Sequence, residues 1–168
     1  DWSSDVCSSD LAAKVKPDQA TLVPERRQEL TTEGGLDVAH NQKKIGQAVK
    51  KLKATGIEVS LFIDPLKNQI KAAKKTGAKF IELHTGAYAN SQNKAEENKR
   101  LAELRSAVDF AGNIGLGVFA GHGLNYNNVS RVAAIKGIAE LNIGHAIISR
   151  ALFAGLSRAV REMKGLIK

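Results

Sequence analysis

The segment F-I-E-L-H-T-G, from Phe80 to Gly86, decides the fold because it joins a short apolar strand to a polar turn. An amphipathic segment that stops at Gly77 precedes it, and a polar loop and a long helical pattern follow it. The same order of helix, glycine, short apolar strand and polar or glycine-rich turn recurs along the chain. Short apolar strands between helices are typical of a parallel sheet that is buried on both faces.

The recurring unit predicts a regular alternation of strands and helices. Strands are expected at 20–23, 57–63, 80–83, 116–120 and 139–143. Helices are expected at 40–54, 66–77, 95–113 and 129–134, and one last helix is expected after His145, running to about Lys164. In the first of these helices the apolar residues recur every three to four positions with lysines on the opposite side, as in a helix that covers a sheet.

Polar residues end nearly every predicted strand, which favours a (β/α)8 TIM barrel over a doubly wound open sheet. Barrels collect their chemistry at the C-terminal ends of many strands, whereas open sheets collect it at one switch point. The sequence has no G-x-G-x-x-G after its first strand and no P-loop. Because a whole barrel needs about 250 residues, we expect residues 12–168 to form only the C-terminal five βα units, strands 4–8, with open edges and low stability on their own.

Residues 1–11, D-W-S-S-D-V-C-S-S-D-L, show no helical or strand period. They match the translated end of a common sequencing adapter, so we expect a non-native leader and exclude it from the fold. A disordered natural N-terminus is the alternative. The only cysteine, Cys7, and the only tryptophan, Trp2, lie in this leader, so we expect no disulfide and no cysteine metal ligand in the remaining chain.

The formal net charge of +8 at pH 7 indicates anionic partners. The lysines are spread over several amphipathic stretches rather than gathered in one run with aromatic residues, so phosphorylated small molecules are favoured over nucleic acid. The sequence shows neither an apolar run of membrane-spanning length nor a signal peptide, and we expect a cytoplasmic protein. It shows no H-E-x-x-H motif, cysteine cluster or lysine at a strand end, so we expect neither metal nor cofactor.

Three of the four histidines, His84, His122 and His145, directly follow a predicted strand. A barrel brings all strand ends to one mouth, and histidine is suited to proton transfer near neutral pH. His122 lies between Gly121 and Gly123, whose backbones let a ligand approach closely. We therefore expect His122 to be catalytic; the alternative is a tight turn whose histidine only caps a helix.

Two further positions carry candidate chemistry. Glu82 lies on the same strand face as His84, where a buried carboxylate serves either catalysis or a structural ion pair in the barrel core. Gly144 and His145 begin a predicted helix, whose free N–H groups and dipole favour a phosphate. An ordinary helix start is the alternative, although barrels frequently bind phosphate at the loops after strands seven and eight.

The loop from Pro24 to Gly35 is long and polar. Arg26 and Arg27 are candidates for a phosphate clamp, and Thr31 offers a hydroxyl. The loop is either a mobile lid or a solvated surface loop, and its residues leave both interpretations open.

Several segments resemble the pyridoxine 5′-phosphate synthase family and stand in that family's order: L-V-P-E-R-R-Q-E-L-T-T-E-G-G-L-D-V (22–38), V-S-L-F-I-D (59–64), F-I-E-L-H-T-G (80–86), A-G-H-G-L-N-Y (120–126) and E-L-N-I-G-H-A-I-I-S-R-A (140–151). The resemblance implies a TIM barrel with extra helices that assembles as a homo-oligomer. It also implies the condensation of 1-deoxy-D-xylulose 5-phosphate with 3-amino-2-oxopropyl phosphate to pyridoxine 5′-phosphate, phosphate and water, without a metal or organic cofactor.

At matching positions the resemblance implies roles for single residues. His122 is implied as the proton donor, Glu82 as the group that stabilises the transition state, and Thr31 as a contact to the deoxyxylulose phosphate. Contacts to the amino-oxopropyl phosphate are implied for Gly123, Gly144 and His145.

The sequence departs from the family in one respect. The family's two proton-accepting residues, a histidine and a glutamate, belong to earlier strands that this sequence does not show, so we expect the chain as it stands not to catalyse the reaction. Two other functions remain open at this point: another phosphate-binding barrel, such as an isomerase or an aldolase-like lyase, and a non-catalytic protein that binds anions through its basic surface.

Overall fold

The computed structural model describes residues 11–24 and 34–167, whose strands form one five-stranded parallel sheet. The strands are β1 (Gln19–Leu22), β2 (Glu58–Ile63), β3 (Phe80–His84), β4 (Gly117–Gly121) and β5 (Ile138–Asn142). They lie side by side in chain order, and each is hydrogen-bonded in parallel to the next. A doubly wound sheet reverses its order at a switch point, so this constant order confirms the prediction of a partial (β/α)8 barrel.

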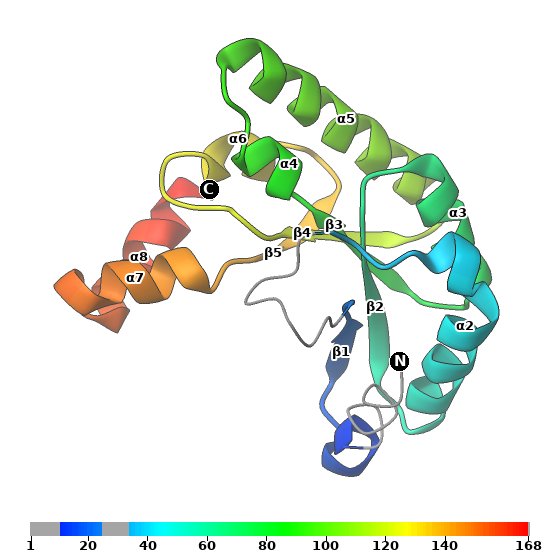
Figure 1. The fold of residues 1–168 in the computed structure, drawn as a ribbon. Coiled ribbons are helices and arrows are strands. Elements are labelled where there is room, and N and C mark those ends of the chain that lie inside the picture. The colour runs from blue at the N-terminus through cyan, green and yellow to red at the C-terminus, as the bar shows by residue number, and fades with distance from the viewer. Residues whose placement is uncertain (1–10, 25–33, 168) are drawn as a thin grey trace.

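The helices lie outside the sheet, and the last two form a pair that extends away from it beyond β5 (Figure 1). They are α2 (Val38–Ala54), α3 (Lys67–Lys75), α4 (Gly86–Ala89), α5 (Lys94–Asn113), α6 (Val129–Ala133), α7 (His145–Ala154) and α8 (Leu156–Leu166), and a short helix also spans 11–15. In α2 the buried side chains include Ile45, Val49 and Leu52, which share one face at the helical period. This is the face that the sequence predicted to cover the sheet.

Helices α2, α3 and α5 are each followed by a glycine with a left-handed backbone. Gly56, Gly77 and Gly115 have φ values of 87°, 83° and 73°, which glycine adopts without steric cost. A lysine of one unit then reaches the glycine of the next, because Lys53 Nζ donates to the Gly77 carbonyl and Lys74 Nζ to the Gly115 carbonyl, both at 2.9 Å. Part of the lysine content therefore caps neighbouring units rather than only solvating helix faces.

Alternate residues of each strand face opposite sides of the sheet. On the helix side Leu61, Ile81 and Leu83 are completely buried and join one continuous core. On the opposite side the parallel register sets Phe62 next to Glu82. Glu82 is followed in the register by Phe119 and then by Glu140. The inner face of the sheet thus carries carboxylates that alternate with aromatic rings, which positions the candidate site.

The C-terminal segment departs from the sequence-based prediction. The single last helix expected after His145 is wrong, because Gly155, with φ at 78°, separates α7 from α8. A left-handed residue interrupts the helical hydrogen-bond pattern, and glycine adopts that conformation readily. The polar loop after β3 also contains α4, which the sequence did not indicate. The expected leader at 1–11 falls almost wholly outside the described residues, and that expectation is untested.

Candidate functional site

A cavity of about 800 Å³ lies at the C-terminal ends of the strands. Its wall comes from Val23 and Phe62, from Glu82 of β3 and Asn142 of β5, from the loops after β4 and β5, and from the start of α7. The predicted site residues that line it are Glu82, His122, Gly123, Gly144 and His145. Thr31, like Arg26 and Arg27, lies outside the described residues. The structure thus gathers five of the six predicted positions at one mouth.

The Glu82 side chain extends over β4 and occupies the space that glycine at position 121 leaves open. A Cβ atom on Gly121 would lie 2.3 Å from Glu82 Oε1, so any side chain there would displace the carboxylate. Burial raises the pKa of Glu82, and the repulsion from Glu140 adds to this rise. A hydrogen bond from the Asn142 side chain opposes it by stabilising the charged form. The carboxylate is therefore held by an amide in a largely dry position.

The ends of β2 and β3 carry a hydrogen-bonded pair that the sequence analysis did not single out. Asp64 Oδ1 lies 3.0 Å from Nδ1 of His84 and also accepts the N–H of Gly35 at 3.2 Å. The bond to His84 is the main cause that lowers the pKa of Asp64, against the opposing effect of partial burial. The carboxylate orients the imidazole with Nδ1–H toward Asp64. The position of Asp64 directly after a strand was the available signal.

The His84 ring in turn contacts the ring of His122. Their centroids lie 4.9 Å apart in an edge-to-face arrangement, and Phe62 lies 5.2 Å from His84 and 6.3 Å from His122. Burial, and second the proximity of His84, lower the pKa of His122 below its ordinary 6.5. A lower pKa makes the protonated ring a stronger acid than free histidine.

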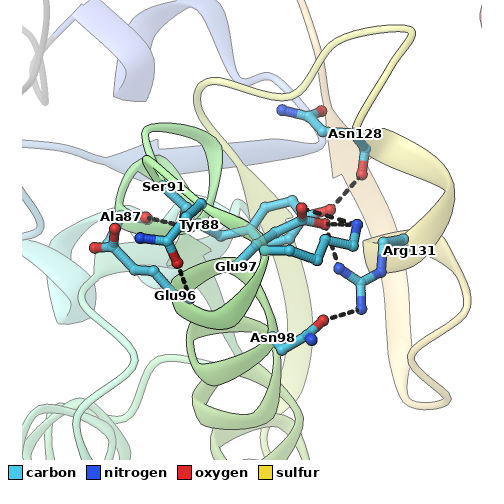
Figure 2. Close-up of polar contacts among 10 residues, drawn as sticks. Ala87, Tyr88, Ser91, Glu96, Glu97, Asn98, Asn128 and Arg131 are labelled. Atoms are coloured by element: carbon cyan, nitrogen blue, oxygen red, sulfur yellow. Dashed lines mark hydrogen bonds and ion pairs between the residues drawn. The ribbon is translucent and has the colours of Figure 1, made fainter.

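The turn after β4 is held from outside the cavity by polar contacts of α4, α5 and α6 (Figure 2). The Tyr88 hydroxyl donates to the Asn128 carbonyl at 2.8 Å, and Asn128 Nδ2 donates to the Gly123 carbonyl at 3.2 Å. Glu97 of α5 forms an ion pair with Arg131 of α6 beside them. The hydrogen bonds of Tyr88 and Asn128 tie the loop that follows His122 to α4 and to the start of α6.

The start of α7 offers unpaired backbone donors to the same cavity. Gly144 is the N-cap residue, and no side chain caps the first turn. The first N–H groups of a helix have no partner within the helix, and together with the helix dipole they favour an anion. His145 and Ser149 line the cavity beside this turn. The arrangement fits the predicted phosphate site.

In residues 11–24 and 34–167 no group of three or more His, Cys, Asp or Glu side chains is placed to hold a metal ion. Within the same ranges, no helix is long and apolar enough to cross a membrane. The cavity offers a buried carboxylate, an imidazole and free backbone N–H groups as its reactive and binding elements.

Consecutive parallel strands with polar side chains at their C-terminal ends define a protein of the TIM-barrel class. Solved structures agree on this fold. The YdjI aldolase from Escherichia coli K12 matches with a TM-score of 0.56 and 16% identity over 94% of this chain and 60% of that chain. A xylose isomerase domain protein from Planctomyces limnophilus matches with a TM-score of 0.56 and 13% identity over 95% of this chain and 66% of that chain. At such identities the likeness shows the fold alone.

Within this class the chain belongs to the family described as pyridoxal phosphate biosynthesis protein PdxJ, whose model matches residues 5–168. Proteins named pyridoxine 5′-phosphate synthase from Geotalea uraniireducens and Pelobacter propionicus are 57% and 54% identical to it over 158 residues. Each alignment covers 94% of this chain and 66% of the relative. The chain thus spans 66% of the length of these relatives, and the family resemblance found in the sequence is confirmed.

Proposed function

We propose that the protein to which this chain belongs condenses 1-deoxy-D-xylulose 5-phosphate with 3-amino-2-oxopropyl phosphate and releases pyridoxine 5′-phosphate, phosphate and water. The observation that carries the proposal is that Glu82, His122 and the uncapped start of α7 line one cavity. The name of the relatives supports the reaction. The cavity of about 800 Å³ also has the size of a typical small-molecule site.

His122 is the proposed proton donor. Loss of water in a ring closure requires a proton on the departing hydroxyl oxygen, because hydroxide is a poor leaving group. Burial and the neighbouring His84 lower the pKa of His122, so the imidazolium gives up its proton more readily than free histidine. The glycine at 123 has a φ of 77° and lets Ala89 of α4 pack against the turn, since a Cβ atom there would lie 2.6 Å from Ala89 Cβ.

Glu82 is the proposed stabiliser of the transition state. Condensation of an amine with a carbonyl group develops positive charge on nitrogen. A carboxylate in a dry cavity acts on such a charge more strongly than it would in water. The amide of Asn142, which bonds to the Glu82 carboxylate, favours the ionised form that this role requires.

The substrate phosphates are proposed to bind at the outer part of the cavity. Gly144, His145 and the first N–H groups of α7 are the proposed contacts to the amino-oxopropyl phosphate, together with Gly123. Thr31 is the proposed contact to the deoxyxylulose phosphate. The net charge of +8 favours the approach of both anions.

The proposal extends to assembly and location. Leu152 and Phe153 of α7 are 81% and 90% exposed, and exposed apolar patches are typical of association surfaces, which supports a homo-oligomer. Phosphorylated substrates do not cross membranes freely, which supports a cytoplasmic enzyme. The proton-accepting histidine and glutamate of the family are proposed to lie outside these residues, so this chain alone is expected to be inactive.

The test is turnover by the full-length protein supplied with both phosphorylated substrates. Wild type should form pyridoxine 5′-phosphate, and His122→Gln should lower kcat by roughly 10²- to 10⁴-fold, the usual contribution of a general acid. His40→Gln is the matched control, because the His40 side chain is 84% exposed and lies on α2. Absence of product from wild type, or turnover of a phosphosugar without the amine, would contradict the proposal; the second result would favour an isomerase or lyase.

A further inference from the structure

His122 has an unusual backbone for a residue with a side chain. Its φ of 80° lies in the left-handed region, which is sparsely populated outside glycine. Such a conformation persists only when the surrounding structure imposes it. His84 and Phe62 contact the imidazole ring of His122. The positive φ belongs to the main chain, so other contacts must hold the backbone of this turn.

Thr85, the first residue after β3, makes contacts with the main chain of this turn. Its hydroxyl oxygen lies 2.7 Å from the Gly121 carbonyl oxygen and 2.5 Å from the His122 carbonyl oxygen. Its N–H also donates to the Gly121 carbonyl at 2.8 Å. Thr85 is completely buried, so water does not compete for these contacts.

We propose that Thr85 is a positioning residue for the reaction, because its hydroxyl shares one proton between the carbonyls of Gly121 and His122 and so keeps the His122 ring turned into the cavity. The inference rests on the proposed role of His122 as proton donor. Without the hydroxyl the His122 carbonyl loses the donor from Thr85, whereas the Gly121 carbonyl keeps the Thr85 N–H, and leaving a buried carbonyl unpaired is costly. The turn is then free to relax toward negative φ, which swings the imidazole away from His84.

The experiment follows the His122 imidazole by NMR titration in the full-length protein. Thr85→Val keeps the shape of the side chain but removes the donor, and it should raise the pKa of His122 toward 6.5, because burial and His84 are what lower it. Thr85→Ser keeps the donor and should titrate as wild type. Thr55→Val is the matched control, since the Thr55 hydroxyl donates to the Leu52 carbonyl at 2.7 Å at the opposite end of the strands.

Turnover gives the second readout. Thr85→Val should lower kcat by about 100-fold with KM nearly unchanged, the order of effect expected when a catalytic group is displaced by about 1 Å, and Thr85→Ser should restore it. If Thr85→Val does not fold, Thr85→Ala is titrated in its place. An unchanged His122 titration in a folded variant without the hydroxyl overturns the inference. Failure of wild type to turn over instead removes the proposed function and leaves the titration result standing.

Discussion

Two regions of the molecule share the candidate site but differ in how they are held. The packed arc consists of β2, β3 and β4 with α2, α3 and α5, and its residues Leu61, Ile81 and Leu83 are completely buried. The terminal helix pair consists of α7 and α8, and α7 has no buried residue at all. Burial of apolar area is the main favourable contribution to folding, so packing stabilises the packed arc far more than it stabilises α7.

The two regions supply different parts of the proposed chemistry. The packed arc supplies Glu82 and His122, whereas α7 supplies the backbone donors for a phosphate. Charged contacts hold α7 to α8, since Arg150 Nε lies 2.8 Å from Glu162 Oε2, and exposed ion pairs contribute little stability. The proposed catalytic groups therefore stand on a rigid support, and the proposed phosphate-binding turn stands on a weakly attached one.

The largest expected effect comes from shortening one leucine in each region. Leu83→Ala should lower the free energy of unfolding by about 2 to 5 kcal/mol, because it leaves a cavity in a closed core. Leu152→Ala, at a side chain that is 81% exposed, should change it by less than about 0.5 kcal/mol. Urea unfolding of both variants measures this. Equal losses of unfolding free energy in the two variants would mean that packing stabilises both regions to the same extent.

A smaller effect is expected from neutralising the carboxylate of the packed arc. Burial raises the pKa of Glu82, so the charged form costs folding energy, and wild-type stability falls as pH rises from 4.5 through the raised pKa. Glu82→Gln should be more stable than wild type by on the order of 1 kcal/mol at pH 7, and this gain should vanish at pH 4. Its turnover should fall at the same time.

Urea unfolding at pH 4 and pH 7 measures the stability of this variant, with Glu58→Gln as a control. The Glu58 side chain is 45% exposed and should show no such pH-dependent gain. A Glu82→Gln protein that is less stable than wild type at pH 7 would show that the carboxylate has a strong compensating partner.

The smallest effect is expected in the terminal helix pair. Hydrogen bonds from Arg150 and then Arg158 lower the pKa of Glu162 to about 2, so its contribution is present above pH 4.5 and is lost as pH falls toward 2. Glu162→Gln should speed amide hydrogen exchange in α7 only a few-fold at pH 7, and wild type should approach the variant near pH 2. Glu103→Gln, whose partner Arg100 lies on the same helix, serves as control. An unchanged α7 would show that the ion pair does not hold it.

The regular part of this architecture was predictable from the sequence because it is periodic. Glycines such as Gly77 mark where helices end, and the short apolar segments between them predicted strands whose polar ends meet. The cavity formed by Glu82, His122 and His145 followed from that same regularity, since parallel strands in chain order bring their C-terminal ends together.

Other features depend on contacts between residues that are far apart in the sequence, which no local pattern predicts. The Asp64–His84 bond and the contacts of Thr85 connect residues 20 to 37 positions apart, and only the strand register sets them side by side. The break at Gly155 was missed because the apolar period continues through it. The raised pKa of Glu82 depends on how deeply the neighbouring strands bury it.

Glu82 and His122, the proposed catalytic groups, stand on a rigid support, whereas the proposed phosphate-binding turn at the start of α7 is loosely attached. Site-resolved amide hydrogen exchange of the purified protein tests this difference most directly, because exchange reports local opening free energies. We predict that amides of β3 and β4 exchange only through global unfolding, and that amides of α7 exchange orders of magnitude faster. Equal protection of α7 and β3 would contradict the account.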